Sequence, residues 1–110
     1  MSERKEYNKL VRDKIPQIIE ESGQVAEVKV LKDDEYEKCL KEKLNEECAE
    51  FQESATVEEL ADVVEVIYAL LDYYGVGLDD FEKIRKKKAH DRGAFKSRLF
   101  LQTVKLVPNI

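Results

Sequence analysis

The sequence predicts an all-α fold in which two long helices form most of the chain. Residues 33–54 and 56–74 carry apolar side chains at the spacing that an α-helix requires. Only 4 Gly and 2 Pro occur in 110 residues, which argues against a turn-rich all-β design. A hydrophobic content of 43% is too high for a disordered chain, so we expect one domain that spans residues 1–110.

Short elements are expected before and after the two long helices. A short helix is predicted with Asp13 as its cap, Pro16 in its first turn and Gly23 at its end. Residues 25–31 alternate apolar and charged side chains, which makes them a candidate β-strand. Residues 100–107 lie in an apolar tail and are either a second candidate strand or an arm that binds a partner.

The second long helix has clear signals at both ends. Thr56 has the capping-box spacing to Glu59, so the helix is expected to begin there. Gly75 and Gly77 break the helical pattern after Tyr74. A third helix is predicted from Leu78 to about Arg92.

Charge and composition argue against several classes of protein. The net charge of −5 gives no basic footprint for general nucleic-acid binding. No stretch approaches the ~20 apolar residues that span a bilayer, and the N-terminus lacks the apolar region of a secretory signal. We therefore expect a cytoplasmic protein without membrane contact, with Cys39 and Cys48 as reduced thiols.

Acidic residues fall inside the apolar stripe of the first long helix. At 100° per residue, Glu47 lies within about 20° of Leu40, and Glu50 lies at the edge of the stripe. Lys43 falls between these two acids, while Glu46 lies further toward solvent. A carboxylate in a core stripe is costly unless it is paired or binds a metal. The stripe is completed by Tyr36, Leu44, Cys48 and Phe51. We expect Cys48 in the core, together with Cys39, Tyr68 and Tyr73.

The second long helix carries a matching acid pair. Glu59 and Asp62 are three residues apart and lie among apolar side chains, as Glu47 and Glu50 do in the first helix. Two such helices packed side by side bring four carboxylates to one point. Because ionised carboxylates repel each other, a hard divalent cation such as Mg²⁺ or Mn²⁺ is the expected occupant. The alternative is an ordinary solvated helix surface with Glu–Lys pairs.

These acids form the pattern EExxE followed by ExxD, read here as Glu46-Glu47-Cys48-Ala49-Glu50 and Glu59-Leu60-Ala61-Asp62. The pattern resembles the signature of the all-α NTP pyrophosphohydrolase superfamily. The segment YNKLVRDKIP (residues 7–16) resembles the start of a MazG-like branch that is called phosphoribosyl-ATP pyrophosphohydrolase-like. The segment KKKAHDRGAF (residues 86–95) resembles the basic helix end of that branch, with Ala94 where a second Gly is usual.

The resemblance implies a MazG-like helical bundle with two long metal-binding helices. It implies Mg²⁺-dependent cleavage of a nucleotide between its α- and β-phosphates, which gives a monophosphate and pyrophosphate. The implied metal ligands are Glu47, Glu50, Glu59 and Asp62, and Glu59 has the alternative role of closing the capping box. Glu46 and Glu47 are the implied catalytic residues, with Glu46 serving a second metal or the attacking water.

Basic and polar residues near these motifs are candidates for nucleotide binding. Arg and Lys make charge-assisted hydrogen bonds to phosphate, and Arg can do so through two nitrogens. The predicted substrate-binding residues are Asn8, Lys9, Arg12, Lys14, Lys43 and Arg92. Lys86–Lys88 are better explained as complements to a helix C-terminus.

Two further functions stay open at the level of the sequence. One is hydrolysis of phosphoribosyl-ATP in histidine synthesis, which the name of the branch suggests. The other is a non-catalytic oligomerisation module, because the second long helix is apolar almost all round. That breadth of apolar surface also predicts a homo-oligomer, either a dimer or a tetramer, since soluble monomers rarely expose large apolar patches.

Overall fold

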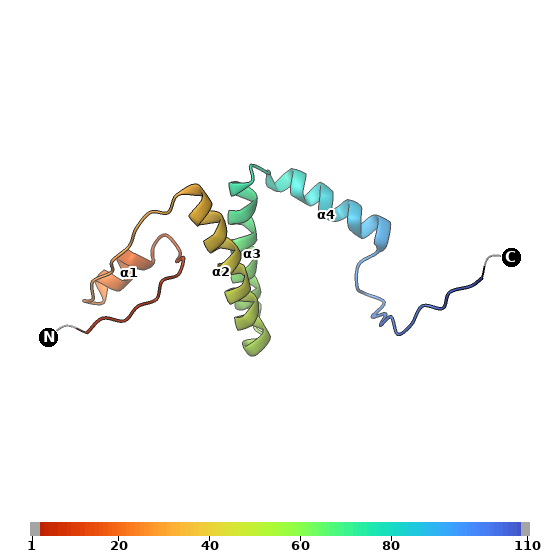
Figure 1. Ribbon diagram of the computed structural model, residues 1–110, viewed down its shortest axis with the longest axis horizontal. Coiled ribbons are helices and arrows are strands. Elements are labelled where there is room, and N and C mark those ends of the chain that lie inside the picture. Colours follow the sequence, from red (N-terminus) through yellow and green to blue (C-terminus); the bar gives the residue numbers. More distant parts are fainter. Residues whose placement is uncertain (1–2, 109–110) are drawn as a thin grey trace. The chain divides into compact units, whose positions relative to one another are not determined.

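The computed structural model describes residues 3–108, which form four α-helices and no β-strand. The all-α prediction is therefore confirmed for this part of the chain. The helices, shown in Figure 1, are α1 (Ile15–Glu21), α2 (Asp33–Ser54), α3 (Val57–Tyr73) and α4 (Leu78–Arg92). The chain divides into two units, one that ends at Val76 and one that begins at Gly77, and each is described by itself.

The prediction of two short strands was wrong. Residues 25–31 and the described residues of 100–107 are irregular chain. Val28 and Val30 are 65% and 97% exposed, so neither packs on a neighbouring layer. Alternation alone does not make a strand, because a strand needs a second segment to which its backbone groups can hydrogen-bond.

Helices α2 and α3 pack against each other, and no other pair of helices within residues 3–108 is in contact. The first turn of each helix is stabilised by nearby side chains. Acidic residues fill the first turn of α2, where they interact favourably with the helix dipole. At the start of α3, the Thr56 hydroxyl accepts a hydrogen bond from the backbone N–H of Glu59 at 3.3 Å. Only Ala55 and Thr56 separate the two helices, and so short a connection folds them into a helical hairpin.

The core of the hairpin is small. Leu40 and Val66 are its buried hydrophobic residues, at 2% and 7% exposure, among the residues that the structure describes. Near the open end of the hairpin, the rings of Tyr36 and Tyr73 meet edge to face at 5.8 Å. The Tyr74 hydroxyl closes this end with a 2.7 Å hydrogen bond to the carboxylate of Glu37.

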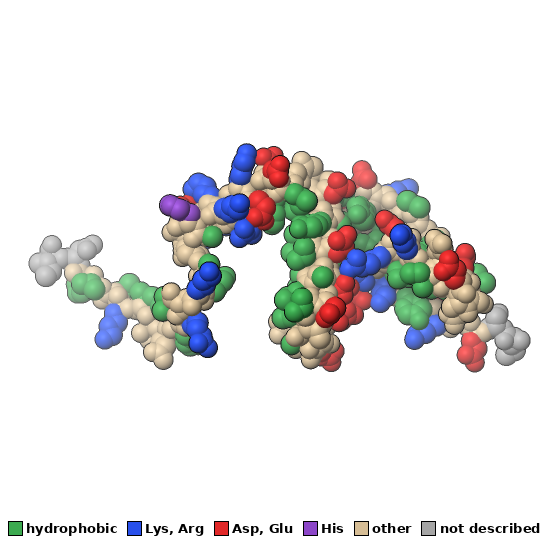
Figure 2. Space-filling view, turned by 180° about the vertical axis from the view of Figure 1, so that it is seen from behind, with side chains coloured by type: hydrophobic (Ala, Val, Ile, Leu, Met, Phe, Trp, Pro, Cys, Tyr) green, Lys and Arg blue, Asp and Glu red, His purple; other side chains and the backbone are tan. Residues whose placement is uncertain are grey.

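An apolar stripe remains exposed along α3. Its members are spaced three or four residues apart and therefore share one helix face. Figure 2 shows hydrophobic side chains in a row along one side of the helical pair, with charged side chains gathered along the other. The stripe consists of Val57 (78% exposed), Leu60 (45%), Val64 (40%) and Tyr68 (44%).

The expectation that Tyr68 and Cys48 belong to the core was wrong, because both are exposed. Tyr68 belongs to the exposed stripe. Cys48 follows Glu47 on α2, and the helical rotation carries it out of the contact with α3. Cys39 and Tyr73, by contrast, are half-buried.

The short helix α1 starts one residue later than expected. Lys14 occupies its N-cap position without a side-chain hydrogen bond, so Asp13 does not cap it. The reason is a turn in which the N–H of Ile15 bonds to the carbonyl of Arg12 at 3.0 Å, which places Asp13 inside the turn. Pro16 lies in the first turn as predicted, and Gly23 follows the helix with a positive φ of 92°.

The second unit contains α4 and the chain that follows it. Glu82 with Arg85 and Lys87 with Asp91 form exposed ion pairs on α4, each at 2.7 Å. After Gly93 the described chain is irregular, and its apolar side chains are exposed. None of the helices within residues 3–108 has the length and apolar content needed to cross a membrane.

The hairpin connection predicts an unusual stabilising substitution. Ala55 adopts the left-handed conformation (φ 52°, ψ 39°), which strains a residue with a Cβ by roughly 1–2 kcal/mol. Ala55→Gly should raise the free energy of unfolding in urea by about 0.5–1 kcal/mol, after the larger entropy of glycine is subtracted. Ala49→Gly, on the exposed face of the same helix, is the matched control and should lower it by about 1 kcal/mol. A loss of stability in both variants would contradict the strained conformation.

Candidate metal centre

Three glutamate side chains converge where α2 packs on α3. Carboxylate oxygens of Glu47 and Glu50 on α2 and of Glu59 on α3 lie within 4.8 Å of one another. Glu47 is 8% exposed. One oxygen of Glu47 and one of Glu59, Oε2 in both cases, are buried without a hydrogen-bond partner in the described part of the chain. Buried polar atoms are nearly always satisfied in folded proteins, so the two orphaned oxygens make this cluster a candidate cation site.

Local structure places each of the three side chains. Glu47 and Glu50 are three residues apart on α2, so they lie one above the other on its face toward α3. Glu59 is in the first turn of α3, where its backbone N–H bonds to Thr56. Thr56 therefore caps the helix through its hydroxyl, whereas the Glu59 carboxylate joins the cluster and does not close a capping box.

The electrostatics of Glu47 reflect its burial. Burial raises the pKa of Glu47, and the adjacent Glu50 carboxylate raises it further, while Lys43 acts in the opposite direction. A folded-state pKa above the unfolded value means that Glu47 supports the fold fully at acidic pH. This contribution is lost as the pH rises through the folded-state pKa. In the absence of a cation, the site therefore holds a carboxylate that is costly to ionise.

A lysine on α2 partly compensates this cost. The Lys43 side chain is 14% exposed, and its ammonium group lies 3.3 Å from Glu47 and 3.2 Å from Glu46. Glu46 also accepts a 3.0 Å hydrogen bond from Lys9. Burial raises the pKa of Glu46, but the hydrogen bonds from Lys9 and Lys43 outweigh it and hold that pKa below its usual value. The hydrogen bond between Lys9 and Glu46 also raises the pKa of Lys9.

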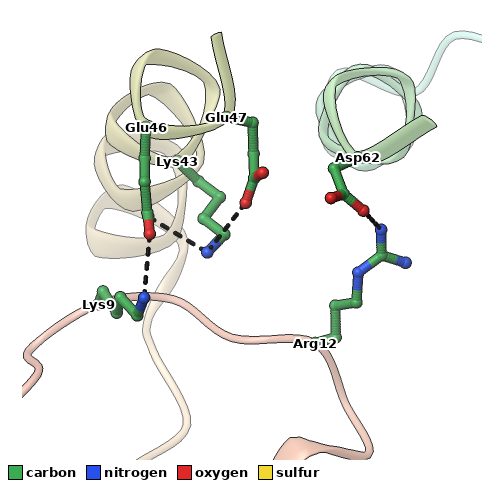
Figure 3. A network of polar contacts seen from close by, with 6 residues as sticks. All are labelled: Lys9, Arg12, Lys43, Glu46, Glu47 and Asp62. Carbon is green, nitrogen blue, oxygen red and sulfur yellow. Dashed lines mark hydrogen bonds and ion pairs between the residues drawn. The ribbon is translucent and has the colours of Figure 1, made fainter. Parts of the chain in front are cut away.

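The fourth predicted ligand has a different partner. Asp62 on α3 accepts a 2.6 Å hydrogen bond from the Arg12 guanidinium and does not belong to the group of three converging glutamates. Figure 3 shows the segment before α1 passing both long helices, with Lys9 reaching Glu46 and Arg12 reaching Asp62. The cations of this segment therefore face the acids of the hairpin.

A cavity of about 440 Å³ adjoins these groups. Hydrophobic side chains, among them Leu40 and Val66, line part of it, and Arg12, Lys43 and Asp62 contribute charged groups. It is open to solvent, and it places apolar surface beside these charged groups. Its walls also include Tyr36, Asp13 and Glu65, none of which was predicted as a binding residue. For Tyr36 a signal existed, since it precedes Leu40 by one helical turn on the same stripe.

The remaining predicted binding residues are spread over the chain. Lys14 lines the same cavity, at the N-cap of α1. Asn8 is exposed and has a positive φ of 47°. Arg92 is the last residue of α4 and belongs to the second unit. The structure thus brings Lys9, Arg12, Lys14 and Lys43 to the hairpin acids.

The donor set fits a hard divalent cation. It offers carboxylate oxygens and no sulfur or imidazole nitrogen, which is the ligand type that Mg²⁺ and Mn²⁺ prefer. A cation there would satisfy the orphaned oxygens and reduce the repulsion that raises the pKa of Glu47.

Comparison with known proteins supplies little beyond this geometry. No protein-family model and no solved structure matches the chain. A stretch of 47 residues is 47% identical to an uncharacterized protein of Mycolicibacterium smegmatis. The match covers 43% of this chain and 48% of that protein, so the chain spans about half the length of its relative.

The buried pair of Lys43 and Glu47 predicts strong energetic coupling. With divalent cations removed by a chelator at neutral pH, Lys43→Met should lower the free energy of unfolding by about 2–3 kcal/mol, because it leaves a buried carboxylate without its cation. In a Glu47→Gln background the same substitution should cost at least ~1 kcal/mol less.

Lys41→Met is the matched control for the comparison of Lys43→Met in the two backgrounds. Lys41 pairs with Glu37 at 3.9 Å on the exposed side of the same helix, so its removal should change stability by less than about 0.5 kcal/mol. Urea unfolding measures the free energy of unfolding of each variant. Equal costs of Lys43→Met in both backgrounds would contradict the coupling.

Proposed function

We propose that this chain is a divalent-cation-dependent nucleotide pyrophosphohydrolase that acts in the cytoplasm. The observation that supports it most is the pair of orphaned carboxylate oxygens of Glu47 and Glu59, buried in a cluster that basic side chains surround. In this proposal the enzyme cleaves a nucleoside triphosphate or a related nucleotide between its α- and β-phosphates. The products are a monophosphate and pyrophosphate.

The glutamates hold the cation in this proposal. Glu47, Glu50 and Glu59 provide the oxygen ligands, and Mg²⁺ is the proposed ion, with Mn²⁺ as a substitute. When bound, such an ion polarises a phosphoryl oxygen and makes a coordinated water more acidic. Glu46 is kept ionised by Lys9 and Lys43, so its carboxylate can accept a hydrogen bond from the attacking water.

Basic residues bind the phosphates. Lys43 pairs with Glu47 and lines the cavity beside it, so its ammonium group can contact a phosphate oxygen once a cation has replaced it at Glu47. Arg12 and Lys14 line the same cavity. This arrangement favours an anionic ligand that carries its own divalent cation, which is the chemistry of a nucleotide.

We also propose that the working form is a homodimer or a larger homo-oligomer built on α3. The support is the exposed apolar stripe of Val57, Leu60, Val64 and Tyr68 in a hairpin whose own core is small. A second copy offers the same stripe, and a two-fold arrangement pairs the two stripes with each other. The partner copy therefore completes a core that a single chain lacks.

Turnover tests the enzymatic proposal directly. A panel of canonical and damaged nucleoside triphosphates with Mg²⁺ should yield pyrophosphate from at least one member. Glu47→Gln and Asp62→Asn should each reduce the rate by a factor of about 10² or more, because both remove a charge at the cation and phosphate site. Circular dichroism should show that both variants stay folded.

Glu53→Gln is the control for this experiment. Glu53 is an exposed acid on α2 outside the cluster, so its replacement should leave turnover unchanged. Near wild-type activity in both Glu47→Gln and Asp62→Asn would refute the assignment. Pyrophosphate release from no member of the panel would favour the non-catalytic oligomerisation module instead.

The oligomeric state is tested separately. Sedimentation at micromolar concentration should give a dimer or larger species for the wild type, and Val64→Glu should shift it toward the monomer, because a charge would be buried in the stripe. Ile18→Glu places the same charge at an exposed apolar position of α1 and should leave the assembly intact. A wild-type monomer that is active would show that the stripe has another role.

A further inference from the structure

Arg12 and Asp62 form the ion pair that separates Asp62 from the other three predicted ligands. They lie 50 positions apart in the chain, and one guanidinium nitrogen of Arg12 meets one oxygen of Asp62 at 2.6 Å. Asp62 follows Glu59 by three residues on α3, so the two carboxylates share a helix face. Asp62 therefore lies next to the cluster but directs an oxygen to a protein cation.

The segment that carries Arg12 is attached to both long helices. Lys9 bonds to Glu46 on α2, and Arg12 bonds to Asp62 on α3 (Figure 3). The segment between them carries Leu10 and Val11, which line the cavity. The two ion pairs thus place this segment along one wall of the proposed nucleotide site.

The Arg12–Asp62 pair is easy to break. The Arg12 side chain is 55% exposed and the Asp62 side chain 38% exposed, so water can replace either partner. The hydrogen bond runs through one guanidinium nitrogen and lacks the second parallel bond that makes Arg–carboxylate pairs strong. Exposed ion pairs contribute little stability, and a divalent cation competes well for the same carboxylate.

We propose that Arg12 is a placeholder that a divalent cation displaces from Asp62, which frees the guanidinium to bind nucleotide phosphate. This inference rests on the proposed function of the same site. With the cation bound, Asp62 joins Glu47, Glu50 and Glu59 as a ligand. Arg12 remains in the cavity that it already lines, where phosphate oxygens offer it a new anionic partner.

The exchange couples the two binding events. Without a cation, Asp62 holds Arg12 and withholds it from phosphate. Cation binding releases Arg12 and so strengthens nucleotide binding, and by thermodynamic linkage the nucleotide strengthens cation binding by the same factor. Arg12 is thus a positioning residue for assembly of the site, and it becomes a substrate contact only after the exchange.

Mn²⁺ titration by calorimetry, without nucleotide, tests the exchange. Arg12→Met removes the competitor and should tighten Mn²⁺ binding by about two- to fivefold. Lys9→Met is the matched control, because Lys9 is attracted to Glu46, Glu50 and Glu47 but does not pair with Asp62. A general loss of positive charge would affect both variants alike. Equal tightening in the two variants would overturn the proposal.

A double-mutant cycle makes the test specific to Asp62. Asp62→Asn should weaken Mn²⁺ binding, and in that background Arg12→Met should no longer tighten it. If Arg12→Met tightens binding equally with and without Asp62, then Arg12 acts through its charge alone and the exchange is wrong.

The guanidinium itself provides a second readout. In the wild type, NMR should show the guanidinium protons of Arg12 exchanging faster with water when Mg²⁺ is added, and more slowly again when inorganic pyrophosphate follows. Unchanged exchange on addition of Mg²⁺ would contradict release of Arg12.

The outcomes separate this inference from the proposed function. If the wild type binds no Mn²⁺, or if Glu47→Gln binds it as well as the wild type, both proposals fail. If Glu47→Gln abolishes binding while Arg12→Met and Lys9→Met behave alike, the metal site stands and the exchange alone is refuted.

Discussion

The organisation of this protein depends on one buried carboxylate. Glu47 lies on α2 in the seam with α3, two turns from Leu40, at a position where its stripe predicts an apolar side chain. Burial there opposes ionisation, and Lys43 offsets the cost for one oxygen only. An apolar residue of similar size would pack there at lower cost, which makes Glu47 a candidate functional residue.

The size of the core is the second constraint. Leu40 and Val66 are the buried apolar residues of the described chain, whereas the stripe on α3 remains in contact with water. A two-helix hairpin cannot cover all sides of an apolar helix, because each neighbour buries only one face. The same helix therefore presents acids toward α2 and the N-terminal segment, and its exposed apolar stripe on the other side. In the proposed oligomer, the site and the interface would use opposite faces of α3.

The N-terminal segment gives the site its positive charge. Lys9 and Arg12 reach acids on different helices, and together with Lys43 they place three cations around the carboxylates. In a chain with a net charge of −5, this local balance is a feature of the fold rather than of the composition. The acids alone fit only a cation. With three basic side chains beside them, the same residues fit the proposed ligand, a polyanion that brings its own metal.

Local signals in the sequence determined the helices. The α2 bounds 33–54 and the starts of α3 and α4 were predicted to within a residue, since helix caps and glycines act within a few positions. The burial of Glu47 and its approach to Glu59 also followed from helical periodicity, because the period decides which face a side chain occupies. The two expected strands failed for the converse reason, since pairing requires a distant segment that the alternation of side chains does not reveal.

Only the tertiary structure decided the partners of the acids. Arg12 and Asp62 are 50 positions apart, and no helical period relates them, so their contact arises from the path of the N-terminal segment along the hairpin. The same holds for Lys9 with Glu46 at 3.0 Å. Periodicity shows which residues face a common side, but the chain's path through space determines which charge meets which. The sequence therefore determined that four acids lie on facing helices, and the fold determined that three converge while the fourth is held by arginine.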